Sequence, residues 1–194
     1  KIQGFDAYTV SNVLKGSGLS SSAAFEVLVG TVINGLFANG EVDAVEIAKF
    51  GQFAENVYYN KPSGLMDQMA SSVGAVVAID FNDTEKPVIK KVEFDLQKHG
   101  HALCIIDSGA DHADLTDEYA TMKEVAAYFG KEYLRQVDKQ EFFDNIKLIR
   151  EKISNDRAVL RAIHFFNENE RAQFEAKAIE DDNFEKFKSL VKES

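Results

Sequence analysis

The sequence GSGLSSSAA, residues 16–24, is the most informative stretch of the chain. Its two glycines permit positive φ angles and let a ligand approach the backbone closely. Its serines supply hydroxyl groups and are expected to cap the helix that follows. The exposed amides and the positive end of that helix favour a bound anion, and a triphosphate is the natural guest. An ordinary capped turn fits the same residues, so the pattern alone leaves both interpretations open.

Two familiar nucleotide-binding loops are excluded by the same stretch. A Walker loop requires Gly-Lys followed by Ser or Thr, and that sequence does not occur at residues 16–24. The dinucleotide-binding fingerprint requires a third glycine, but Ser21 occupies that position. A phosphate-binding loop of another kind is therefore the functional hypothesis for these residues.

Patterns on either side of the loop predict a mixed α+β protein. Apolar residues spaced three and four apart predict helices, and segments rich in Val and Ile predict strands. The predicted helices span residues 21–38, 43–59, 65–72, 116–129, 138–152, 155–178 and 181–192. The predicted strands span residues 5–14, 75–81, 88–94 and 102–107. The change of pattern indicates a domain boundary between residues 62 and 80.

A second unusual stretch, NKPSGLMDQ, covers residues 60–68. Its Pro and Gly predict a rigid loop that leads into Asp67, which is flanked by Met66 and Met69. A semi-buried carboxylate can have a shifted pKa, which suits a general base. The alternative is an aspartate at a helix start that satisfies backbone donors.

Glu55 is the candidate metal ligand among the acidic residues. At 100° per residue it lies about 80° from the apolar stripe of Ile47 and Ala54, at the edge of the buried face. Mg²⁺ needs few protein oxygens besides phosphates and water, so one serine hydroxyl and this carboxylate would suffice. A solvated glutamate with no such role is the alternative.

The charge of the chain excludes several classes of partner. Its 32 acidic and 22 basic residues give a net charge of −10. Such a chain repels nucleic acid and anionic membranes unless it carries a concentrated basic patch, and the sequence shows none. No apolar run approaches the roughly 18 residues that span a bilayer. Neither nucleic acid nor a membrane is therefore expected as a partner.

The single cysteine and the histidines lack the spacing of a metal site. Cys104 lies in the apolar run 102–106 and is expected to be buried, which fits a reducing, cytoplasmic setting. His164 is expected to be buried in the core, whereas His99 and His101 are expected to lie in solvent.

The two motifs, in this order, resemble those of the GHMP kinases. GSGLSSSAA matches the phosphate-binding motif of that family, and NKPSGLMDQ is similar to the N-x-P-x-G-x-M-D-Q segment of its galactokinase branch. The resemblance implies an α+β fold. Residues 1–75 would end an N-terminal, ribosomal-S5-like α/β domain that binds ATP, and residues 76–194 would form part of a C-terminal, ferredoxin-like α+β domain.

The resemblance also implies a role for individual residues. The ATP phosphates would be bound by Gly16, Ser17, Gly18, Leu19, Ser20, Ser21 and Ser22. Ser22 and Glu55 would hold Mg²⁺. Asp67 would be the base toward the sugar hydroxyl, and both Asp67 and Tyr119 would contact the sugar.

The implied reaction is the ATP-dependent phosphorylation of the anomeric (C1) hydroxyl of galactose or a related hexose, which yields the sugar 1-phosphate and ADP. Two alternatives remain open: a catalytically silent sensor of sugar and ATP, and a GHMP kinase that acts on a different small alcohol. The family's N-terminal sugar-binding motif and C-terminal glycine-rich motif do not occur in these 194 residues. We therefore expect a central fragment that is inactive alone, and the sequence does not indicate its oligomeric state.

Overall fold

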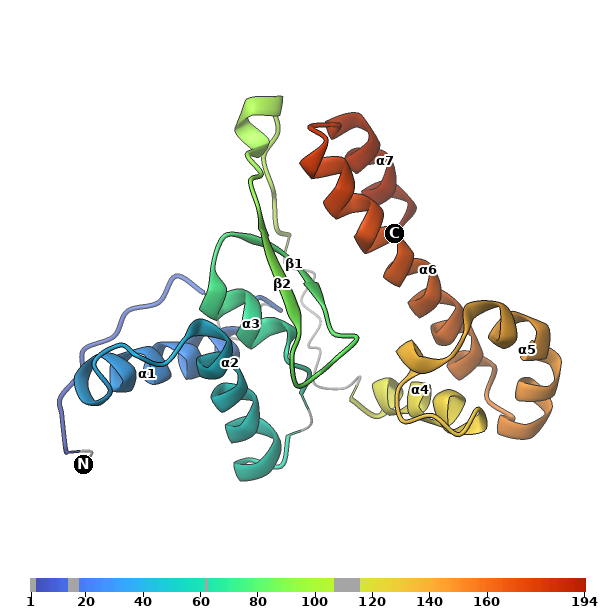
Figure 1. Cartoon of the computed structure of the whole chain (residues 1–194), viewed down its shortest axis with the longest axis horizontal. Helices are drawn as coiled ribbons and strands as arrows, with labels where there is room; N and C mark the ends of the chain where they lie inside the picture. Colours follow the sequence, from blue (N-terminus) through green and yellow to red (C-terminus); the bar gives the residue numbers. More distant parts are fainter. Residues whose placement is uncertain (1–2, 14–17, 62, 107–115) are drawn as a thin grey trace. The chain divides into compact units, whose positions relative to one another are not determined.

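The structure is a computed structural model, and it describes residues 3–13, 18–61, 63–106 and 116–194, the last range by backbone alone up to residue 120. The chain divides into two compact units (Figure 1). The first comprises Lys1–Val77 and Ile105–Asp111, and the second comprises Ala78–Cys104 and His112–Ser194. Of the helices in the described ranges, none combines the length and the apolar composition that crossing a lipid bilayer requires.

Three helices that pack against one another form the first unit: α1 (Ser21–Phe37), α2 (Ala44–Phe53) and α3 (Met66–Val73). Their shared interior contains the buried apolar side chains Ala23, Val27, Ile47, Ala48, Leu65 and Met69. Asp43 caps α2 as its sequence predicts, because its carboxylate accepts a hydrogen bond from the Glu46 amide at 2.9 Å. Each helix thus buries one apolar stripe, and these stripes determine which faces of the three helices pack together.

The end of α2 widens into a π-helical turn, η1 (Ala54–Tyr58). The Tyr59 amide donates to the Ala54 carbonyl at 3.0 Å, five residues back instead of four. The loop that follows is tied to this turn through Asn56, whose side chain accepts from the Ser63 amide at 2.6 Å and donates to the Ser63 carbonyl at 3.1 Å. The loop before α3 is therefore fixed relative to the π-helical turn.

The second unit contains a group of helices and a two-stranded sheet, except for the first two residues of the sheet, Val76 and Val77, which belong to the first unit. Strand β1 (Val76–Asp80) pairs with β2 (Val88–Val92), and the short helix η2 (Leu96–His99) follows. The remaining elements are α4 (Thr116–Tyr128), η4 (Leu134–Gln136), α5 (Lys139–Ile153), α6 (Asp156–Glu180) and α7 (Phe184–Glu193). Helix α7 packs along α6 (Figure 1).

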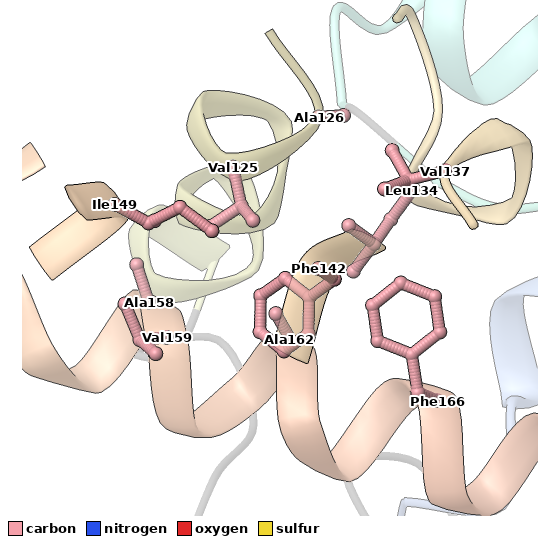
Figure 2. Close-up of a cluster of buried hydrophobic side chains, with 10 residues drawn as sticks. All are labelled: Val125, Ala126, Leu134, Val137, Phe142, Ile149, Ala158, Val159, Ala162 and Phe166. Atoms are coloured by element: carbon pink, nitrogen blue, oxygen red, sulfur yellow. The ribbon is translucent and has the colours of Figure 1, made fainter. Parts of the chain in front are cut away.

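The core of the second unit lies between α4, η4, α5 and α6 (Figure 2). Phe142 and Phe166 form its centre, with ring centroids 4.9 Å apart. The other buried members are Val125, Ala126, Leu134, Val137, Ile149, Ala158, Val159 and Ala162. Fully burying each of the larger side chains contributes about 1.5–3 kcal/mol, so this cluster is the main source of stability in the unit.

The helix predictions are confirmed to within three residues at each end, and so are the strands predicted at 75–81 and 88–94. The other two strand predictions are wrong for the residues described, because 5–13 and 102–106 form no strand. Alternating or apolar residues permit a strand, but a strand also needs a hydrogen-bonded neighbour. Neither segment has one within the described ranges.

Three predictions about burial are also wrong. Cys104 is exposed, together with the apolar run around it. The side chain of His164 is 66% exposed, because it points away from the buried stripe that carries Ala162. His99 is half-buried, and its ring stacks on Phe184 with centroids 4.2 Å apart. His101 is exposed, as predicted.

Candidate active site

The described part of the glycine-serine loop enters α1 through two residues with left-handed backbone conformation. Gly18 has φ 73°, and Ser20 has φ 57°. A side chain caps a helix from an extended backbone, so Ser20 makes no side-chain cap, and the predicted serine cap is wrong. Ser21 is half-buried, whereas Leu19 and Ser22 are exposed. Gly16 and Ser17 lie outside the described residues.

Glu55 is only 5% exposed, which is deeper than the predicted edge of the buried face. It is the second residue of the π-helical turn, and the wider turn changes the angle at which it leaves the helix. Lys61 Nζ lies 2.8 Å from Glu55 Oε1, and Gln68 Nε2 donates to Glu55 Oε2 at 3.3 Å. Ser22 lies close enough to this carboxylate to lower its pKa. The structure therefore places the two predicted metal ligands, Ser22 and Glu55, near each other.

The surroundings of Glu55 keep it ionised. Burial by itself raises the pKa of Glu55, but hydrogen bonds from Lys61 and Ser63 and the positive charge of Lys61 outweigh burial. The nearby Ser22 acts in the same direction. The pKa of Glu55 is consequently lowered, and an ionised carboxylate is what a cation site requires.

A second carboxylate, Glu26 on α1, was not predicted. Gln68 Nε2 donates to Glu26 Oε2 at 3.2 Å. Burial is the main reason that the pKa of Glu26 is raised, the hydrogen bond from Gln68 opposes it, and the neighbouring Glu55 raises it further. One signal in the sequence could have identified Glu26: it follows Ser22 by four residues, which places both on one face of α1.

A glycine allows these groups to approach one another. A Cβ atom on Gly51 of α2 would lie 3.2 Å from Gln68 Cγ and 3.3 Å from both Cβ and Oε2 of Glu26. Contacts this short would force the neighbouring side chains to move. The missing side chain at Gly51 thus helps to define the positions of Glu26 and Gln68.

The other predicted site residues do not join this group of contacts. Asp67 lies in the first turn of α3 and is exposed rather than semi-buried, as is the adjacent Met66. Asp67 immediately precedes Gln68, so its backbone lies next to the contacts among Glu26, Glu55 and Gln68, although its own side chain is exposed. Tyr119 belongs to α4 in the second unit, and its side chain lies outside the described residues. The roles of Asp67 and Tyr119 stay predictions.

The oxygen donors of Ser22 and Glu55 fit Mg²⁺, which prefers hard oxygen ligands and needs few from the protein. In the part of the chain that the structure describes, no group of three or more His, Cys, Asp or Glu residues could hold a metal ion. A cavity of about 270 Å³ lies in the second unit, beside His99, Asp182 and Phe184. None of the predicted site residues lines that cavity, so the contacts around Glu55 are the better candidate for chemistry.

Comparison with known proteins agrees with the two motifs. The family described as the GHMP kinases N terminal domain matches residues 1–75. A galactokinase of Streptomyces coelicolor is 33% identical over 178 residues, which cover 89% of this chain and 45% of the relative. A galactokinase of Glaesserella parasuis is 32% identical over 197 residues, covering 100% of this chain and 50% of the relative.

A solved structure is similar over most of the chain. The crystal structure of Lactococcus lactis galactokinase complexed with galactose matches with a TM-score of 0.69 and 30% sequence identity. The match covers 92% of this chain and 46% of the Lactococcus protein. The predicted α+β fold is confirmed by this similarity and by the helices and sheet described above. The chain spans about half the length of the relatives it matches.

Proposed function

Because this chain belongs to the GHMP kinases, we propose that it is part of a kinase that phosphorylates a sugar with ATP. The acceptor is the anomeric hydroxyl of galactose or a related hexose, and the products are the sugar 1-phosphate and ADP. Two facts support galactose as the substrate: the relatives of about 32% identity are galactokinases, and the similar crystal structure contains galactose.

The proximity of Ser22 to Glu55 is the observation that carries this proposal. The hydroxyl comes from the glycine-serine loop and the carboxylate from the π-helical turn after α2, far apart in the sequence. Phosphoryl transfer depends mainly on positioning and on the stabilisation of charge. A loop that binds anions next to an ionised carboxylate provides both requirements in one place.

Each proposed role follows from the chemistry of the residue. The ATP phosphates bind at the start of α1, where amides and the helix dipole attract negative charge. Ser22 and Glu55 would hold Mg²⁺, which would neutralise phosphate charge. Asp67 removes the proton from the sugar hydroxyl, and Tyr119 contacts the sugar. In this proposal, residues 1–75 belong to the ATP-binding domain and residues 76–194 to the C-terminal domain, in a cytoplasmic enzyme.

The proposal is tested on the whole protein by measuring ADP release with ATP, Mg²⁺ and a panel of sugars and small alcohols. Galactose is expected to give the highest kcat/KM. Turnover with a non-sugar alcohol alone would identify a different GHMP kinase, and tight binding of sugar and ATP without ADP release would identify a sensor.

Asp67→Ala tests the base. A general base accelerates a reaction by about 10²–10⁴-fold, so kcat should fall by a factor in that range. Glu41→Ala, which changes an exposed carboxylate before α2, is the matched control and should leave kcat unchanged. An unaltered kcat in Asp67→Ala would remove Asp67 from the mechanism.

A further inference from the structure

Gln68 is a buried amide that two carboxylates from two other helical segments share. The residue is 1% exposed. Its Nε2 atom lies 3.2 Å from Glu26 Oε2, 3.3 Å from Glu55 Oε2 and 3.5 Å from Ser63 Oγ. A side-chain amide nitrogen carries two hydrogens, so it can donate to both carboxylates at once. Gln68 therefore connects α1, the π-helical turn and α3 at one point.

The orientation of the Gln68 amide is determined by its neighbours. If the amide were rotated by 180°, its carbonyl oxygen would face two carboxylates and be repelled by them. In the observed orientation, Oε1 is buried and accepts no hydrogen bond from the described residues. A buried acceptor without a partner costs about 1–3 kcal/mol. An apolar residue such as the neighbouring Met69 would avoid that cost, but it could not donate to the two carboxylates as Gln68 does.

The shared amide restricts the position of the Glu55 carboxylate. Lys61 holds one oxygen of Glu55 at 2.8 Å, and Gln68 holds the other at 3.3 Å. With both oxygens held, the orientation of the carboxylate beside Ser22 is restricted. Lys61 is largely exposed, whereas Gln68 is buried, so Gln68 is the more rigid of the two supports.

We propose that Gln68 is a positioning residue for Glu55, with Glu26 as the second anchor of the same amide. The inference rests on the proposed function, in which Glu55 and Ser22 hold Mg²⁺. Residues that orient a metal ligand without touching the metal commonly change metal affinity by about 10–100-fold when they are replaced. The effect of Gln68 is therefore on cation affinity and not on sugar binding.

The test uses the whole protein with Gln68→Met, which keeps most of the side-chain volume and removes both hydrogen bonds. The Mg²⁺ concentration for half-maximal activity should rise by about 10-fold or more, with kcat recovering at high Mg²⁺ and the KM for the sugar unchanged. Mn²⁺ binding in the presence of ATP, measured by electron paramagnetic resonance, should weaken by the same factor. This second measurement does not depend on turnover.

Gln52→Met is the matched control. Gln52 also donates its side-chain amide to this loop, to the Ser63 carbonyl at 3.2 Å, but that bond is to the backbone and not to a carboxylate. Gln52→Met should lower the melting temperature without changing the Mg²⁺ requirement. Unchanged Mn²⁺ affinity in folded Gln68→Met would overturn the inference, while an absence of Mg²⁺-dependent transfer in the unsubstituted protein would instead overturn the proposed function.

A second pair of variants applies if Gln68→Met does not fold. Glu26→Gln keeps an oxygen that can accept from Gln68, and Glu26→Met removes that acceptor; both lose the charge. Glu26→Met should therefore raise the Mg²⁺ requirement several-fold more than Glu26→Gln. Equal effects of the two variants would show that Glu26 acts only through its charge, and the anchoring role would be rejected.

Discussion

The ammonium group of Lys61 lies 2.8 Å from Oε1 of Glu55, so a largely exposed lysine neutralises an almost fully buried carboxylate. Burying a charge without a partner is costly, and the pair explains how Glu55 stays ionised inside the first unit. In the proposed enzyme the same carboxylate also binds a divalent cation. Lys61 is then the residue that satisfies Glu55 when no cation is bound.

Lys61→Met should destabilise the protein, because it leaves the buried Glu55 without its positive partner. Breaking a fully buried ion pair costs about 3–5 kcal/mol, and the exposure of Lys61 reduces the expected loss to about 1–2 kcal/mol. The free energy of unfolding, measured by urea titration, gives this value. Added Mg²⁺ should restore part of the loss.

Lys49→Met is the control for this prediction. Lys49 forms a 2.9 Å ion pair with Glu46 on the surface of α2, and such pairs contribute about 0.2–1 kcal/mol. If the two lysine variants lose equal stability, burial of Glu55 does not determine the strength of its pair with Lys61.

The contrast between Ser22 and Gln68 shows how much of the site the sequence could predict. Ser22 and Glu55 were predicted as partners through the family resemblance, and they lie near each other. Gln68 and Glu26 were missed, because their importance lies in contacts between helices that are distant in the sequence. The π-helical turn that buries Glu55 was missed as well, since apolar spacing assumes a regular helix.

Prediction of the fold was limited in the same way, because the sequence pattern of a segment does not show its contacts with distant segments. Helices were predicted well because apolar periodicity and capping residues such as Asp43 are local signals. The wrong strand at residues 5–13 and the wrong cap at Ser20 both depend on information from outside the segment. A strand requires a neighbour, and the left-handed conformation of Ser20 follows from how the loop enters α1.

Gly51→Ala should disturb the site while barely changing the stability of α2. Replacing a helical glycine by alanine usually gains about 1 kcal/mol, but here the new Cβ would crowd Gln68 Cγ at 3.2 Å and Glu26 at 3.3 Å. We expect the gain in stability to be offset and the Mg²⁺ requirement to rise. Thermal unfolding and Mg²⁺ titration of activity measure the two effects.

Gly35→Ala on α1 provides the comparison. Apart from its chain neighbours and the backbone of its own helix, the added Cβ would meet no atom within 4 Å. This variant should be stabilised by up to about 1 kcal/mol and keep its Mg²⁺ requirement. Should Gly51→Ala behave in the same way, the close packing at Gly51 has no influence on the site.

Glu175→Gln on α6 should stabilise the protein at neutral pH. Burial raises the pKa of Glu175, and Arg171 opposes that shift only in part. A raised pKa means that the folded state favours the protonated form, so this group destabilises the protein as pH rises through its folded pKa. Glutamine removes that effect, and the gain should be up to about 0.5 kcal/mol at pH 7.

The pH dependence is the decisive part of the Glu175 prediction. The two proteins should differ least at low pH, where Glu175 is protonated in both folded and unfolded states, and most at neutral pH. Melting temperatures between pH 4 and 7 measure this difference, with the exposed Glu151 on α5 as the control for Glu→Gln replacement. A difference that stays constant with pH would mean that ionisation of Glu175 is not the cause.

The effects of Ser22→Ala and Glu55→Gln on the Mg²⁺ requirement should not be independent of each other. If both side chains hold the same cation, either substitution alone already weakens cation binding. The second substitution then weakens it by a smaller factor than it would in the unsubstituted protein. The double variant should therefore show a smaller increase than the product of the two single increases. The required measurements are four Mg²⁺ titrations of activity, supported by Mn²⁺ binding with ATP. Effects that multiply would place Ser22 and Glu55 in separate roles, and the cation site proposed from their proximity would have to be abandoned.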